Sequence, residues 1–155
     1  MKRILLLASF FIIILSNYVC ASSWENVYYD NEESAYIDID SIRYAYDKEN
    51  GFDVNHILFW EKIHLDKHKN DDFKDLDTMY CYNNLNVNDR KCAILAYDYI
   101  DTKGNRYDMR NGSGKFLSID RNGETLAVYN FLVQYCKNND ELIKENEGKG
   151  ISISD

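Results

Sequence analysis

FDVNHILFWEKIHL, residues 52–65, is the longest strand candidate in the sequence. Successive side chains of a strand point to opposite faces of a sheet, so every second residue belongs to the same face. One face carries apolar groups at Leu58 and Trp60, and the other carries them at Ile57 and Phe59. Because both faces are apolar in the middle, we expect a central strand that is covered on both sides.

Further strand patterns lie on both sides of this stretch. Alternation of apolar and acidic side chains in AYIDID is typical of a half-buried strand. The segment Asn-Val-Asn-Asp between two longer candidates favours a hairpin turn, because Asn and Asp tolerate left-handed backbone conformations. The expected strands are residues 24–30, 35–40, 52–65, 76–85, 91–101, 106–110 and 115–119, with a short helical turn over 41–46.

The hydrophobic period changes near the C-terminus. Residues 124–137 contain no Gly or Pro, and Leu126 and Val133 fall on one apolar stripe at helical spacing. Asp120 or Asn122 is the expected cap at the start of this helix. The sequence therefore predicts an α+β fold, in which an antiparallel sheet of about six strands packs against one C-terminal α-helix.

The N-terminus has the pattern of an export signal. Two basic residues precede a twelve-residue apolar run, and a compact residue and Ala21 occupy positions −3 and −1 of a signal-peptidase site. The apolar run is shorter than the roughly 20 residues of a membrane-spanning helix. We expect a signal peptide over 1–21, cleavage between Ala21 and Ser22, a single domain over 22–137 and a disordered polar tail over 138–155.

Lipid attachment at Cys20 is the alternative for the N-terminus. Lipidation favours a small residue before the cysteine, and Val19 occupies that position, so cleavage after Ala21 is favoured. In either case the protein is exported. We expect it in the periplasm, at the cell surface or secreted.

The charge of the chain limits its partners. The net charge is −8, and it becomes −10 without residues 1–21, which carry two basic and no acidic side chains. So acidic a protein is unsuited to nucleic acid and to anionic membrane surfaces, which both need patches of Lys and Arg. Basic partners stay possible.

Two groups of residues have spacings that resemble those of metal ligands. His64 and His68 have the i and i+4 spacing of zinc ligands on a helix, but they lie where a strand runs into a charged loop. Asp38 and Asp40 resemble the start of a calcium loop, but the Gly and the closing Glu of such a loop are missing. We therefore expect no metal and no cofactor.

Three cysteines remain after cleavage: Cys81, Cys92 and Cys136. An oxidising compartment allows one disulfide among them, and the residues alone leave all three pairings open. A Cys–His nucleophile is conceivable, but Cys81 and Cys92 lie inside strand patterns, which favours a disulfide or a buried thiol. Since no motif identifies a nucleophile or a base, we expect no catalytic residue and no enzyme.

Four motifs occur in an order that is similar to a known family. They are Trp24-Glu25-Asn26-Val27; Tyr36-Ile37-Asp38 with Ser41-Ile42; Phe59-Trp60-Glu61-Lys62; and Cys92, Tyr97-Asp98 and Gly104 followed by a helix that ends in Cys136. In this order they resemble the surface-adhesin protein E-like family of small exported bacterial proteins. The resemblance covers residues 24–137.

The resemblance implies an antiparallel sheet packed against a C-terminal helix, with a disulfide between Cys92 and Cys136. Such a bridge would stabilise the fold by roughly 2–4 kcal/mol. The sequence departs from the family at Asp120, where many members have Pro, and at the additional Cys81, which makes a Cys81–Cys92 bridge the alternative. Namesake members bind host matrix or plasma proteins.

The leading hypothesis is therefore an exported, adhesin-like protein-binding module without enzymatic activity. Its partner would be a host matrix or envelope protein, and pairing of edge strands would allow a homodimer. The alternative is an inhibitor of an exported hydrolase, which the acidic charge favours by electrostatic complementarity. A small hydrolase is a third hypothesis, but the sequence contains no catalytic motif that supports it.

Overall fold

The computed structural model describes residues 23–66 and 75–145. The expected signal peptide, its cleavage site and most of the charged loop after residue 65 lie outside these ranges. The strands are β1 (Trp24–Tyr29), β2 (Glu33–Asp38), β3 (Arg43–Asp47), β4 (Gly51–Leu65), β5 (Leu76–Asn86), β6 (Lys91–Asp101), β7 (Arg106–Asn111) and β8 (Leu117–Ser118). The helices are a 3₁₀ turn η1 (Ile39–Ser41), α2 (Glu124–Asn138) and α3 (Asp140–Glu145).

All strands form one antiparallel sheet in the order β1-β2-β4-β5-β6-β7. Strand β4 is long enough to pair with two strands along one edge. Its first part pairs with β3, between Gly51 and Leu58, and its last part pairs with β2, between Glu61 and Leu65. The expectation that residues 52–65 form a central strand is confirmed.

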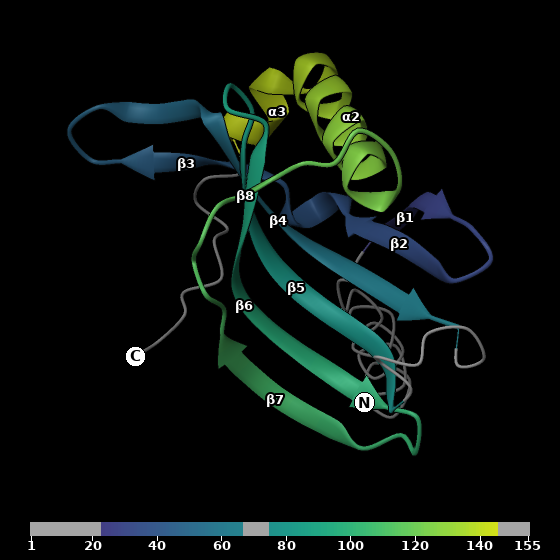
Figure 1. Cartoon of the computed structure of the whole chain (residues 1–155). Coiled ribbons are helices and arrows are strands. Elements are labelled where there is room, and N and C mark those ends of the chain that lie inside the picture. Colours follow the sequence, from purple (N-terminus) through teal and green to yellow (C-terminus); the bar gives the residue numbers. More distant parts are fainter. Residues whose placement is uncertain (1–22, 67–74, 146–155) are drawn as a thin grey trace, which may run out of the picture.

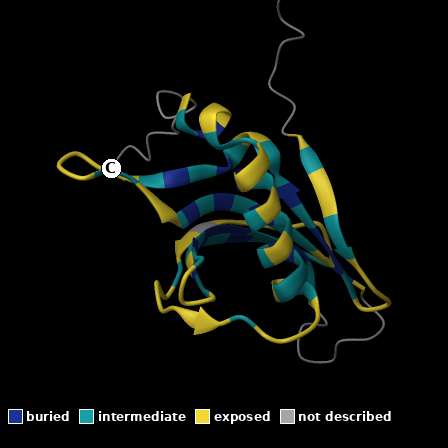
Figure 2. Ribbon diagram, turned by 90° about the horizontal axis from the view of Figure 1, so that it is seen from above, coloured by how far each residue is buried: buried dark blue, intermediate teal, exposed yellow. Residues whose placement is uncertain are grey.

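Helices α2 and α3 lie together on one side of the sheet (Figure 1). The stripe of α2 that faces the sheet is buried and contains Val128, Leu132 and Cys136. It packs on sheet residues that are almost fully buried, including Ile37 and Phe59. The outer side of α2 is mostly exposed, as the yellow segments of Figure 2 show. The predicted α+β fold, with a C-terminal helix on an antiparallel sheet, is confirmed.

The second face of β4 differs from the expectation. No helix of the described residues covers it, although Phe116, from the segment before β8, packs on His56 of this face. Leu58 and Trp60 lie on this face and are only partly buried. The second face of β4 is apolar, as the sequence pattern predicted. In the part of the chain that the structure describes, it is not covered by a second layer of secondary structure; instead, large aromatic side chains on this face pack on one another.

Four local predictions were wrong: the helical turn over 41–46, the N-cap of α2, the strand over 115–119 and the disordered tail from residue 138. Residues 41–46 form the end of η1 and strand β3, because they pair with the first part of β4. The N-cap of α2 is Gly123, with φ of 83° and no capping side chain, so neither Asp120 nor Asn122 has that role.

The expected last strand is reduced to the two residues of β8, which pair with the start of β6. Helix α3 lies inside the stretch for which a disordered tail was expected. Its Ile143 is only 2% exposed and packs into the core, so part of that stretch belongs to the fold. The rest of the tail, from residue 146, lies outside the described residues.

Candidate functional site

The open face of the sheet carries a set of aromatic and cationic side chains. Trp60 and Lys62, for example, lie on either side of Glu61, which is buried on the opposite face of β4. We call this set the aromatic–cation face. It consists of Trp24, Tyr36, Arg43, Trp60, Lys62, Tyr80, Tyr82 and Arg106.

Lys62 is held between two rings at one end of this face. Its Nζ lies 4.2 Å from the ring centroid of Tyr36 and 5.0 Å from that of Trp24. The rings of Trp24 and Tyr80 meet edge to face, with centroids 6.0 Å apart. A cation over an aromatic face is attracted by the negative potential of the ring, so these contacts fix the side chains of β1, β2, β4 and β5 relative to one another.

Arg43 anchors the middle of the face. Its guanidinium lies 5.5 Å from the centroid of the Tyr82 ring, and it donates a hydrogen bond of 2.6 Å to the Tyr82 hydroxyl. Tyr82 in turn packs on Trp60, with ring centroids 5.3 Å apart. The backbone N–H of Trp60 donates to the Ser41 hydroxyl at 2.8 Å. Strand β3 and the end of η1 therefore hold this part of the face in place.

Arg106 of β7 forms the far end of the face. Its guanidinium lies 5.9 Å from the Tyr80 ring and donates to the carboxylate of Asp98. The Asp98 side chain is 9% exposed and that of Arg106 is 63% exposed, so the cation remains accessible to solvent. The hydrogen bond to Asp98 raises the pKa of Arg106 above its usual value.

The side chains of this face are of the kinds found at contact surfaces. The aromatic–cation face contains both tryptophans of the chain, Trp24 and Trp60. Tryptophan, tyrosine and arginine are enriched at protein interfaces, because each combines a large apolar area with a polar or charged group. The rings are already packed on one another, so little conformational freedom remains to be lost when a partner binds.

The two histidines within the described residues, His56 and His64, both have polar partners. The Nδ1 of His56 lies 2.9 Å from the Oδ1 of Asn84, and its Nε2 lies 3.2 Å from the Nδ2 of Asn86. Both ring nitrogens are therefore occupied by side-chain amides. These contacts orient the ring in a structural role.

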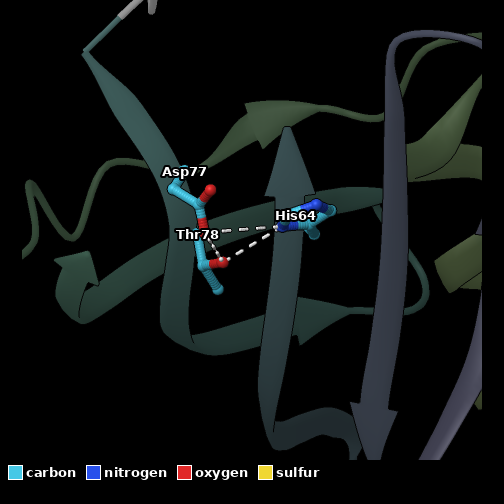
Figure 3. A network of polar contacts seen from close by, with 3 residues as sticks. All are labelled: His64, Asp77 and Thr78. Carbon is cyan, nitrogen blue, oxygen red and sulfur yellow. Dashed lines mark hydrogen bonds and ion pairs between the residues drawn. The ribbon is translucent and has the colours of Figure 1, made fainter. Parts of the chain in front are cut away.

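His64 belongs to a small polar network with two residues of β5 (Figure 3). Its Nδ1 lies 3.2 Å from the Oγ1 of Thr78 and 3.7 Å from the Oδ2 of Asp77. The Thr78 hydroxyl donates to the carboxylate of Asp77 at 3.0 Å. The three side chains therefore form one connected polar network.

A depression of about 400 Å³ lies beside His64, between the β1–β2 turn and the end of β4. It is lined by Tyr29, Asp30, Asn31, Glu33, Ser34, His64, Leu65 and Asp66. The depression is largely open, and Asp30 and Glu33 give it an acidic lining. It does not enclose a substrate in the way that a catalytic cleft does.

Those candidate metal ligands that the structure describes are not part of a metal site. Among residues 23–66 and 75–145, no three His, Cys, Asp or Glu side chains come close enough to hold a metal ion. The Oδ1 of Asp38 accepts the N–H of Asp40 at 3.2 Å and so caps η1. His68 lies outside the described residues. Within the same ranges, no helix has the length and the apolar content needed to cross a lipid bilayer.

Cys81, Cys92 and Cys136 are free thiols in the structure, and Cys81 and Cys136 are buried. Burial raises the pKa of Cys92 and of Cys136 to about 12 and raises the pKa of Cys81 as well. A thiol of this kind is protonated at neutral pH and is a poor nucleophile. The Cys92–Cys136 bridge and the alternative Cys81–Cys92 bridge stay predictions.

Sequence reasoning missed the buried residue Glu61. It is 6% exposed, between Trp60 and Lys62 in β4, and it points toward α2. The Nδ2 of Asn83 donates to its Oε2 at 2.7 Å. The sequence contained a signal for this burial, because alternation along the strand places Glu61 on the same face as the apolar residues Phe59 and Ile63.

No protein-family model and no curated protein matches this chain. Two solved structures of Haemophilus influenzae protein E are similar to it. The structure of crystal form II has a TM-score of 0.50 and 19% sequence identity, and the match covers 76% of this chain and 89% of the protein E chain. The other structure has a TM-score of 0.47 and 20% sequence identity, and the match covers 84% of this chain and 90% of the protein E chain. The chain therefore shares its fold with Haemophilus influenzae protein E, as the resemblance in sequence predicted.

Proposed function

We propose that this chain is an exported, adhesin-like module that binds a protein partner through the aromatic–cation face. One observation carries the proposal. Both tryptophans of the chain and several tyrosines lie together with three cations on a sheet face that no helix of the described residues covers. A set of this size is larger than single scattered apolar residues and is typical of an interaction surface.

The partner class follows from the resemblance and from the chemistry of the face. Namesake members of the resembling family bind host matrix or plasma proteins, and the fold shared with protein E supports the same kind of role. Export is supported by the signal pattern over residues 1–21, and N-terminal sequencing of the secreted protein tests the expected start at Ser22.

The second hypothesis, inhibition of a basic hydrolase, has less support from the structure. Its basis is the acidic net charge of the chain. The aromatic–cation face contributes Arg43, Lys62 and Arg106, so a basic partner would have to bind elsewhere. Binding that weakens strongly at high salt would favour the inhibitor, whereas binding centred on aromatic contacts is less sensitive to salt.

The test uses one variant on the face and one matched variant away from it. Trp24→Ala removes a half-buried ring that contacts Lys62 and Tyr80. Tyr46→Ala removes an aromatic ring that is 53% exposed in the β3–β4 hairpin, outside the face. Both proteins and the wild type are titrated onto immobilised extracellular-matrix and plasma proteins.

We expect saturable binding to at least one of these proteins. Trp24→Ala should weaken it by about tenfold or more, as truncation of an interface tryptophan does, and Tyr46→Ala should leave it unchanged. Absence of any saturable partner would contradict the binding function. Equal affinity of all three proteins would show that the partner does not use this face.

A further inference from the structure

The contact between β4 and the first turn of α2 contains a buried carboxyl group with too few donors. Glu61 is 6% exposed, and its Oε1 has no hydrogen-bond partner. Asn83 is 2% exposed, and its Oδ1 is also unpartnered, although its Nδ2 donates to Glu61. Buried acceptors without donors are unfavourable, so a proton on Glu61 would relieve the shortage.

The groups around Glu61 supply no positive side chain. Glu124, in the first turn of α2, lies within hydrogen-bonding reach of the Glu61 carboxyl, and Glu33 of β2 is also close. Cys81 of β5 and Cys92 of β6 face the same region as thiols. Among the described residues, Glu61 has no ion pair with a lysine or arginine.

The positive end of the α2 dipole is the remaining favourable charge near Glu61. It amounts to roughly half an elementary charge. It also acts on Glu124, which belongs to the first turn itself. Two carboxylates beside one helix end cannot both be neutralised in this way, so a proton on the buried Glu61 gives the most favourable arrangement.

We infer that Glu61 and Glu124 form a proton-dependent latch, in which a protonated Glu61 holds the first turn of α2 against the sheet and its ionisation loosens that turn. The latch does not depend on the proposed binding function. It lies on the side of the sheet opposite the aromatic–cation face, so a variant of Glu61 leaves the side chains of that face in place.

The direction of the pH effect follows from the burial of Glu61. Burial, and next the neighbouring Glu124, raise the pKa of Glu61 well above its ordinary value in the folded protein. A carboxyl whose folded pKa is raised contributes stability that is complete at acid pH, below the ordinary carboxyl pKa. That contribution is lost as the pH rises through the folded pKa. The latch is therefore closed at acid pH and opens at higher pH.

The test compares thermal unfolding of the wild type, Glu61→Gln and Glu49→Gln between about pH 5 and about pH 8. Glutamine keeps the shape of the side chain and cannot ionise. Glu49 is exposed in the β3–β4 turn and serves as the matched control. We expect the Tm of Glu61→Gln to rise relative to the wild type by several degrees as the pH increases, and Glu49→Gln to follow the wild type.

A second measurement reports on the wild type alone, in case Glu61→Gln does not fold. The carboxyl carbon of Glu61 is followed by NMR during a pH titration. We expect an apparent pKa well above the usual value of about 4.3, with faster hydrogen exchange in the first turns of α2, corrected for intrinsic rates, above that pKa. A carboxyl that titrates near its usual value, or a Glu61→Gln variant whose Tm stays parallel to the wild type, would overturn the latch.

Discussion

At the scale of single residues, β4 separates two kinds of environment within three positions. Trp60 and Lys62 lie among aromatic rings on the open face, and Glu61 between them lies in the dry contact with α2. Alternation along a strand predicts this separation from the sequence. Which rings lie beside Lys62 could not be predicted, because Trp24 and Tyr36 come from other strands whose register is set by the whole sheet.

Asn83 gives a prediction at this scale. It is 2% exposed and donates to Glu61 at 2.7 Å, so Asn83→Ala leaves a buried carboxyl with even fewer donors. We expect the free energy of unfolding to fall by about 1–3 kcal/mol, measured by urea denaturation at about pH 7. Asn130→Ala, on the exposed side of α2, is the control and should change it by less than about 0.5 kcal/mol. Equal effects would show that the Asn83–Glu61 hydrogen bond is unimportant for stability.

At the scale of elements, the sequence predicted the parts that depend on local patterns. The hairpin of β5 and β6 and the helix over residues 124–137 follow from turn residues and from helical spacing, and both are confirmed. Strand β3 was missed, because its five residues become extended only through pairing with distant β4. Helix α3 was missed because one buried side chain, Ile143, fixes an otherwise polar segment to the core.

Leu132 tests whether the helix is fixed by the core that the fold implies. It is 0% exposed and packs, in the middle of α2, with the buried residues of the sheet. Leu132→Ala should lower the free energy of unfolding by about 2–5 kcal/mol, because it removes buried methyl groups and leaves a cavity.

The matched control is Leu142→Ala in α3. Leu142 is 49% exposed, so the same chemical change removes little buried area and should have an effect within about 0.5 kcal/mol. Denaturant unfolding of both variants gives the comparison. A small effect of Leu132→Ala would contradict the described packing of α2 on the sheet.

At the scale of the whole molecule, α2 and α3 lie on one side of the sheet, and no helix of the described residues lies on the other side (Figure 1). The acidic chain places Arg43, Lys62 and Arg106 on the open side, each over an aromatic ring. Strand patterns predicted an antiparallel sheet, but they could not predict that one face would gather these rings. That grouping depends on strand order, which local patterns do not determine.

The most direct test of the proposed binding face uses intrinsic fluorescence. Trp24 and Trp60 are the two tryptophans of the chain, and both lie on the aromatic–cation face, so their emission reports on that face. The purified protein is titrated with the matrix or plasma protein that binds it, and emission and acrylamide quenching are recorded. We predict a blue shift and protection from quenching that saturate together with binding. Saturable binding with unchanged emission and unchanged quenching would contradict the account, because the partner would then occupy another surface.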